Sequence, residues 1–324
     1  MGVARAAWCD DRRELDRLRI LVLGAGVIGS VYAVKLLQAG HDVVLLARGT
    51  RLVDLQTHGL ILEDAQTGDR SVLPVAAVSE PVVDDHFDLV LVSVRAEQLV
   101  STLPVLTGLT DGSDVLFFGN TANYEAKLRA ALGERVVFGF PAAGGTRDGS
   151  VVKYVLIAQQ KTMLGEPDGT TSPRVRHLQS VLSEAGFPTL ISANIEDWLM
   201  AHAAFVVPIA FALYRVGINP ARLAADAATM RLMVLATREA FTALRADGND
   251  EIPTNLRILY RLPTRVVTGY WHRVFNSPRG ELWFGAHTRA ALEEMRHMAD
   301  QLQESLLQTG RPTPDLDKLL TPRL

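Results

Sequence analysis

The segment that most constrains the fold lies near the start of the chain and reads Arg19-Ile20-Leu21-Val22-Leu23-Gly24-Ala25-Gly26-Val27-Ile28-Gly29. An apolar strand, three glycines spaced G-x-G-x-x-G and a helical stretch follow one another, and a second apolar strand comes at Val43-Val44-Leu45-Leu46. This order is typical of a dinucleotide-binding βαβ unit. Glycines that serve only a turn are the alternative, and the complete order of parts favours the dinucleotide site.

Each glycine has a mechanical task in such a site. Gly24 allows the tight turn out of the strand, Gly26 lets backbone approach a pyrophosphate, and Gly29 lets helix and strand pack closely. The helix that begins near Val27 and Ile28 offers unpaired N–H groups and a positive dipole to the phosphates. We therefore expect these five residues to bind the cofactor.

The tip of the second strand indicates which dinucleotide is bound. NAD sites usually carry Asp or Glu there for the ribose 2′-hydroxyl, whereas this chain has Arg48, with Arg51 close behind. A guanidinium can grip a 2′-phosphate with two parallel hydrogen bonds, and a carboxylate would repel it. The sequence predicts NADP(H), with a solvated loop arginine as the alternative for Arg48.

Composition excludes several classes of partner. The 324 residues carry a formal net charge of −3, which gives no overall attraction for nucleic acid or an acidic membrane. The single cysteine, Cys9, has no partner for an intrachain disulfide, so we expect a cytoplasmic protein. The scattered histidines lack Cys or carboxylate partners at ligand spacing, and no metal site is expected.

The pattern of the chain predicts two domains after an N-terminal extension at 1–18. Apolar strands at 87–94, 114–118 and 135–140 alternate with helices, which is typical of a doubly wound parallel sheet, an α/β Rossmann-type domain over 19–192. Residues 151–158 and 161–165 are expected to form a β pair, followed by a helix at 173–185 and a strand at 188–191. Long helices at 220–248 and 284–309 predict an all-helical domain over 193–324, which would bind substrate and mediate dimerisation.

With these residues laid out, the chain resembles divergent members of the ketopantoate reductase (2-dehydropantoate 2-reductase) family over 19–317. The resemblance rests on the glycine motif, Arg48, Val92-Ser93-Val94-Arg95 where the family has a strand ending in lysine, Asn120, and Glu294. It implies NADPH in a cleft between the two domains and hydride transfer to a ketone. It also implies that Arg95 and Asn120 lie beside the cofactor, and that Glu294 contacts substrate. A solvated arginine and a solvated glutamate are the alternatives for Arg95 and Glu294.

The chain departs from the family on the helix that begins Glu196-Asp197-Trp198-Leu199-Met200-Ala201-His202. Family members carry a general-acid lysine two residues after this tryptophan and asparagines four and eight residues further on. Here these positions read Met200, Ala204 and Pro208, and the chain has no lysine from 162 to 317. Methionine cannot donate a proton. A more apolar substrate pocket is therefore expected around Met200, Ala204, Phe205 and Trp198.

Histidine is the best substitute for the missing acid, because its pKa near 6.5 suits proton donation at neutral pH. His202 would face the cleft if the register slips by one residue, and a core or capping histidine is the alternative. His287 lies two turns before Glu294 and is expected near the same cleft. Ser277 is the nearest match to the family's substrate-binding serine.

These observations leave two functions open. The first is an NADPH-dependent reductase acting on a small carbonyl or imine compound, with His202, Glu294 and Asn120 as catalytic residues and a substrate other than ketopantoate. The second is an NADP-binding scaffold that has lost redox chemistry and binds a ligand or catalyses a non-redox step such as a cyclisation. Expected partners are a small-molecule substrate and a second copy in a homodimer, without nucleic acid or membrane.

Overall fold

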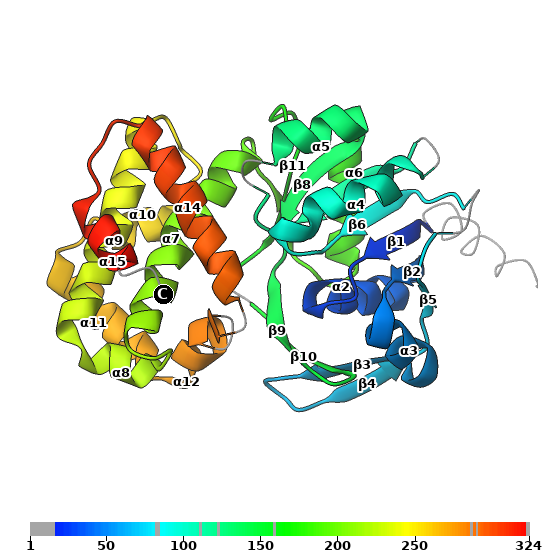
Figure 1. Ribbon diagram of the computed structural model, residues 1–324, viewed down its shortest axis with the longest axis horizontal. Helices are drawn as coiled ribbons and strands as arrows, with labels where there is room; N and C mark the ends of the chain where they lie inside the picture. The colour runs from blue at the N-terminus through cyan, green and yellow to red at the C-terminus, as the bar shows by residue number, and fades with distance from the viewer. Residues whose placement is uncertain are drawn as a thin grey trace, which may run out of the picture.

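The computed structural model describes residues 17–81, 85–109, 112–121, 124–157, 160–285, 288–289 and 291–321. A sheet-containing half and a helical half lie side by side (Figure 1). The predicted fold class, a Rossmann-type α/β domain followed by an all-helical region, is confirmed.

The main sheet of the first half has eight strands. In spatial order they are β12 (Thr189–Ile191), β11 (Thr162–Gly165), β8 (Val136–Phe140), β7 (Asp114–Phe118), β6 (Leu89–Val92), β1 (Arg19–Leu23), β2 (Asp42–Leu46) and β5 (Ala76–Val78). The strands from β8 to β5 are parallel, and β11 runs antiparallel to β8. The carboxyl ends of β1, β2, β6 and β7 therefore meet at one edge, where ligands of open α/β sheets bind.

Helices cover both faces of this sheet. Alternate residues of β1 separate into two cores: Ile20 and Val22 pack with one set of helices, and Leu21 and Leu23 pack with the other. The covering segments are α2 (Val27–Gln38), α3 (Gly49–His58), η1 (Ala96–Gln98), α4 (Leu99–Thr107), α5 (Glu125–Leu132), η2 (Gly133–Arg135) and α6 (Pro173–Glu184). Burial of both faces explains why the strands are almost continuously apolar.

A second, four-stranded sheet packs beside α2. Its order is β4 (Arg70–Leu73), β3 (Leu60–Asp64), β10 (Val151–Leu156) and β9 (Ala143–Asp148). The expected pairing of 151–158 with 161–165 is wrong, because β10 pairs with β9 and β3 whereas β11 returns to the main sheet beside β8. The local pattern identified both strands, but their partners come from segments far away in the chain.

The second half contains helices around one core. They are α7 (Ile195–Arg215), α8 (Pro220–Ala225), α9 (Ala227–Ala246), α10 (Thr254–Leu259), α11 (Thr264–Phe275), α12 (Pro278–Gly280), the π-helical turn η3 (Glu281–Gly285), α14 (Leu292–Gln308) and α15 (Pro314–Leu320). The expected helix over 220–248 is divided at Asp226, whose carboxylate accepts from the N–H groups of Ala228 and Thr229 and caps α9. The expected helix from 284 is divided, because Glu281–Gly285 is a π-helical turn and the long helix α14 spans Leu292–Gln308.

Helix α7 joins the two halves. Ile195, Trp198 and Leu199 pack into the core of the sheet, whereas residues from Ala201 to Tyr214 form the centre of the helical core. This helix is long and apolar enough to cross a membrane by length and composition, and 67% of its apolar window is buried inside the protein. Such burial is the pattern of a central core helix.

Candidate active site

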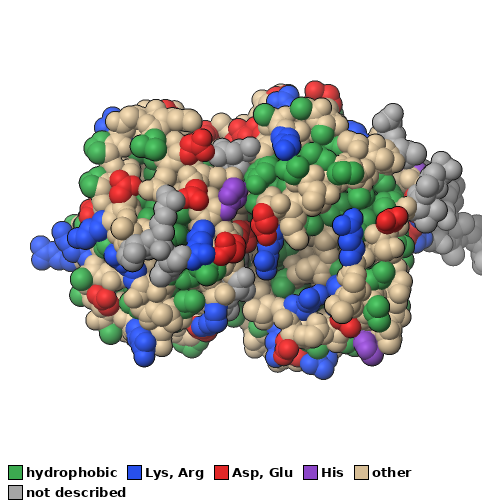
Figure 2. Space-filling view, in the orientation of Figure 1, with side chains coloured by type: hydrophobic (Ala, Val, Ile, Leu, Met, Phe, Trp, Pro, Cys, Tyr) green, Lys and Arg blue, Asp and Glu red, His purple; other side chains and the backbone are tan. Residues whose placement is uncertain are grey.

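A cleft of about 1650 Å³ lies between the carboxyl edge of the main sheet and the helical half. Figure 2 shows the molecule hollowed between its two halves. Of the residues expected to bind cofactor or act in catalysis, those that line it are Gly24, Gly26, Val27, Ile28, Arg48, Arg95, Asn120, His202 and Glu294. The fold thus brings together residues that span most of the sequence.

The glycine loop has the shape that a dinucleotide requires. Gly24 adopts φ +110°, which favours glycine. A Cβ on Gly29 would lie 2.0 Å from the carbonyl oxygen of Gly24, so this residue holds helix and loop together and lies behind the cleft wall. A Cβ on Gly26 would meet nothing within 4 Å, and α2 begins there without a side-chain cap. Open space before an uncapped helix N-terminus fits a pyrophosphate.

Arg48 and Arg51 have different surroundings although they are three residues apart. Arg48 is exposed in the cleft, at the N-cap of α3 and just past β2. Arg51 is buried, and its guanidinium donates to Ala25 O (3.1 Å), Ser30 Oγ (3.2 Å) and Ser150 O (3.2 Å). Of these two arginines, Arg48 can turn toward a ligand, whereas Arg51 holds the glycine loop against α3 and the β9–β10 turn.

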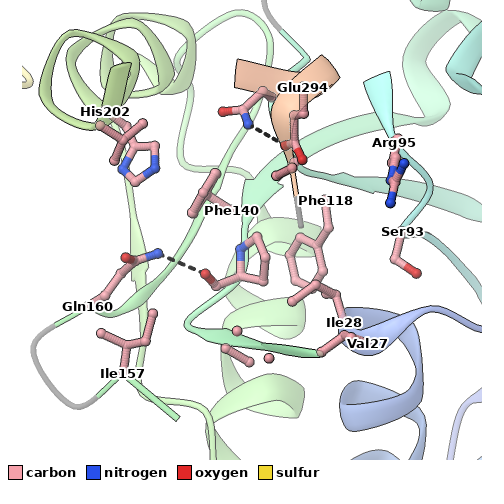
Figure 3. A pocket seen from close by; sticks show the side chains of 18 of the residues that line it. Val27, Ile28, Ser93, Arg95, Phe118, Phe140, Ile157, Gln160, His202 and Glu294 are labelled. Atoms are coloured by element: carbon pink, nitrogen blue, oxygen red, sulfur yellow. Dashed lines mark hydrogen bonds between the residues drawn. The ribbon is translucent and has the colours of Figure 1, made fainter. Parts of the chain in front are cut away.

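The segment after β6 forms the next part of the wall. Ser93 Oγ donates to Gly24 O at 2.9 Å and so fixes the glycine loop against β6. Arg95 is exposed where this strand has ended, and its backbone N–H donates to Gln98 Oε1. In Figure 3 the side chains of Ser93 and Arg95 lie on the same side of the cleft as Val27 and Ile28.

Asn120 and Glu294 connect the two halves across the cleft. Asn120 follows β7, and its Nδ2 donates to Glu294 Oε1 on α14 at 2.9 Å. A second contact lies nearby, where Tyr124 Oη and His297 Nε2 are 3.3 Å apart. Asn120 Oδ1 is buried, and among the described residues it has no hydrogen-bond partner. The amide and the carboxylate are therefore held together at the middle of the cleft.

His202 is held on the opposite side by aromatic rings. Its imidazole stacks on Trp198 with centroids 5.4 Å apart and planes 10° apart, and it lies 4.3 Å from the ring of Phe140. The residues of α7 that line the cleft are Trp198, His202, Phe205, Val206, Ile209 and Ala210, which repeat at helical spacing. Figure 3 shows the imidazole beside Phe140 and above Gln160.

Three residues expected at the substrate do not line the cleft, and a fourth lies outside the described residues. Met200 packs against the helical core and Ala204 is buried in it, because they lie on the face of α7 away from His202. Ser277 caps α12, with its Oγ donating to Val274 O. His287 lies outside the described residues. Sequence spacing alone could not fix which face of α7 turns toward the cleft.

The helical half contributes an aromatic wall, in which Phe205 was predicted from the sequence and Trp271 and Phe284 were missed. Phe205 from α7 lies 5.8 Å from Trp271 of α11 and 6.3 Å from Phe284 of η3, measured between ring centroids. All three residues line the cleft. Phe205 precedes the other two by more than 60 residues, so no local pattern signals their contact.

Comparison with known proteins relates the chain to one family. The ketopantoate reductase family PanE/ApbA matches residues 20–169. Over this sheet-containing half the chain resembles the ketopantoate reductase family. A 2-dehydropantoate 2-reductase from Pyrococcus abyssi is 25% identical over 191 residues, which span 57% of this chain and 60% of the relative. The uncharacterized oxidoreductase YkpB of Bacillus subtilis is also 25% identical, over 58% of this chain and 62% of its own length.

Solved structures extend the likeness in fold to both halves of the chain. A 2-dehydropantoate 2-reductase from Geobacter metallireducens has a TM-score of 0.77 at 18% identity, covering 94% of this chain and 98% of its own. The structure of D-mandelate dehydrogenase with NADH and anilino(oxo)acetate has a TM-score of 0.71 at 19% identity, covering 93% and 96%. At these identities the likeness establishes the fold.

Proposed function

We propose that this protein belongs to the ketopantoate reductase family and is an NADPH-dependent reductase of a carbonyl or imine compound that binds between the two halves. The observation that carries the proposal is that one cleft joins the glycine loop to His202 and to the Asn120–Glu294 pair. Gly26 and the uncapped start of α2 fit a pyrophosphate, and Arg48 at the tip of β2 fits a 2′-phosphate.

The chain's own residues supply binding and the proton. When bound, the dihydronicotinamide supplies a hydride to the substrate carbon. The His202 imidazolium donates a proton to the oxygen or nitrogen, so that an alcohol or amine results. The stacked Trp198 and the neighbouring Phe140 orient the imidazole. Glu294 accepts from Asn120 Nδ2, which orients the amide toward the cleft.

The substrate that fits this cleft is bulkier than ketopantoate. Phe205, Trp271 and Phe284 present aromatic rings to the cleft, and Arg95 and Lys161 in the same lining are available for a carboxylate. The structural similarity to D-mandelate dehydrogenase in complex with anilino(oxo)acetate supports an aromatic 2-oxo compound. We therefore expect faster turnover of phenylglyoxylate than of ketopantoate.

Cofactor choice is tested by titrating NADPH and NADH against the purified chain. We expect NADPH to bind more tightly, and Arg48→Ala to weaken NADPH binding about tenfold or more while NADH binding changes little. Arg176→Ala is the matched control, because this exposed arginine on α6 does not line the cleft. Equal binding of the two cofactors by the unaltered chain would contradict the NADPH preference.

The role of His202 is tested by following NADPH oxidation with phenylglyoxylate. His202→Gln should lower kcat by about 10²–10⁴-fold and remove the fall in rate that the unaltered chain shows as pH rises through the histidine pKa. His58→Gln, an exposed histidine at the end of α3, is the control. An unchanged pH profile in His202→Gln would assign the proton to another group.

The alternative is a scaffold that binds NADP without redox turnover. The observation that favours it is that the sequence has no lysine from 162 to 317, so α7 places no lysine in the cleft. Nicotinamide absorbance and product formation, recorded together, separate the two functions. Product formed with constant absorbance indicates a non-redox enzyme, whereas equal amounts of oxidised cofactor and product support the reductase.

A further inference from the structure

The segment from residue 252 to 280 has a charge balance unlike that of the whole chain. It contains five arginines and one histidine but no aspartate or glutamate, although the whole chain has a net charge of −3. The segment forms α10, α11 and α12, and α11 is on the outer flank of the helical half (Figure 1). The positive charge is therefore concentrated on one part of the surface.

Large apolar side chains are exposed among these arginines. Ile258 is 58% exposed, Leu262 40%, Val266 49% and Tyr270 43%, and they recur every four residues. They account for half of the eight large apolar residues that are strongly exposed in the described part of the chain. We call the surface formed by these four residues and Arg257, Arg261, Arg265 and Arg273 the basic apolar ridge. Apolar exposure so concentrated marks an interaction site.

The exposed apolar residues are not needed for the core. The opposite face of α11 already buries Val267, Trp271, Val274 and Phe275. The turn that carries Leu262 is also fixed from behind. Arg238 of α9 donates to Tyr260 O at 2.9 Å, Leu262 O at 2.8 Å and Thr264 Oγ1 at 2.9 Å. The ridge is thus presented on a rigid support.

The ridge arginines are available for an external anion. Within the described ranges, Arg257, Arg261, Arg265 and Arg273 form no salt bridge with a carboxylate. Other arginines of the same half are paired, as Arg289 is with Glu281 (2.8 Å) and Arg296 with Glu293 (2.7 Å). The surface therefore has both an apolar component and uncompensated positive charge.

We propose that the basic apolar ridge docks the protein on an anionic lipid surface. Arginines beside aliphatic and tyrosine side chains on a helix face have the composition of interfacial amphipathic helices, which combine headgroup attraction with shallow apolar insertion. A second copy fits the ridge less well, since a two-fold contact centred on it would oppose arginine to arginine. The inference does not depend on the reaction in the cleft.

The test is co-sedimentation of the full chain with vesicles of phosphatidylcholine alone or mixed equally with phosphatidylglycerol. We expect binding to the anionic vesicles that is at least tenfold stronger than to the neutral ones and is reduced by high salt. Arg261→Glu with Arg265→Glu should abolish it, and Leu262→Ser with Val266→Ser should weaken it about tenfold. All four side chains are solvent-exposed, and circular dichroism checks that the variants fold.

Two control variants show whether the ridge itself is responsible. Lys127→Glu with Arg176→Glu makes the same change of charge on α5 and α6 and should leave vesicle binding intact. Absence of binding to anionic vesicles overturns the proposal, and so does equal loss in the controls. Sedimentation equilibrium then tests whether a second copy of the chain binds the ridge. If the unaltered chain is a dimer and Leu262→Ser with Val266→Ser converts it to a monomer, the ridge is a dimer interface and the lipid proposal is overturned.

Discussion

At the scale of single residues, alanine substitutions at two glycines of the loop should have different effects, one on stability and the other on cofactor binding. A Cβ on Gly29 would lie 2.0 Å from Gly24 O and 2.4 Å from Ser93 Oγ, so Gly29→Ala must displace the backbone. We expect this variant to lose about 1–3 kcal/mol of stability. Gly26→Ala has open space around the new methyl group and should keep its melting temperature while binding NADPH more weakly. Thermal melts and cofactor titrations of both variants check the contrast.

Arg51 provides a second contrast, with Arg48. Its guanidinium satisfies Ala25 O and Ser30 Oγ inside the protein, so Arg51→Ala leaves buried acceptors unpaired and should cost about 2–3 kcal/mol. Arg48 is exposed, and Arg48→Ala should not change the denaturant midpoint. Urea unfolding of the two variants distinguishes them. Equal midpoints would mean that the hydrogen bonds of Arg51 do not contribute to the stability of the protein.

At the scale of elements, Glu196 at the start of α7 has a carboxyl group with a raised pKa. Partial burial and the neighbouring Glu125 carboxyl on α5 raise the pKa of Glu196 to about 8. The folded protein therefore holds a proton that the unfolded chain releases between about pH 4.5 and 8, and stability falls as pH rises through this window. Glu196→Gln should raise the melting temperature at pH 8 and leave it nearly unchanged at pH 4.5.

Glu125→Gln is the matched variant for this pair. It removes the same repulsion but also the Glu125–Arg129 ion pair of 3.1 Å, so it should raise the melting temperature at pH 8 by less than Glu196→Gln does. A Glu196→Gln variant whose melting curve shifts equally at both pH values would show that the two carboxyl groups do not share the titration.

Elements also show what the sequence could and could not predict. The βαβ unit and the buried strands were predicted because their signals, glycine spacing and continuous apolar runs, are local. The pairing of β10 and β11 was not, since strand partners come from distant parts of the chain. In α7 the residue types were clear, but Met200 and Ala204 face the core while His202 faces the cleft. The rotation of a helix depends on what packs around it.

At the scale of the whole molecule, α7 determines how the two halves unfold. Leu199 is 2% exposed and packs in the core of the sheet, and from Ala201 onward the same helix forms the centre of the helical core. Unfolding either half would remove support from the other. We therefore expect one calorimetric transition although each half has its own hydrophobic packing.

Cofactor binding should move that single transition as a unit. At a concentration of 100 times its Kd, NADPH adds about 2.7 kcal/mol to the free energy of unfolding, which raises the melting temperature by about 5 °C for a chain of this size. Leu199→Ala should weaken the link and split the endotherm, with NADPH raising only the transition of the sheet domain. Leu128→Ala, a fully buried control on α5, should lower the melting temperature without splitting it. Two transitions in the unaltered chain would show that α7 does not couple the halves.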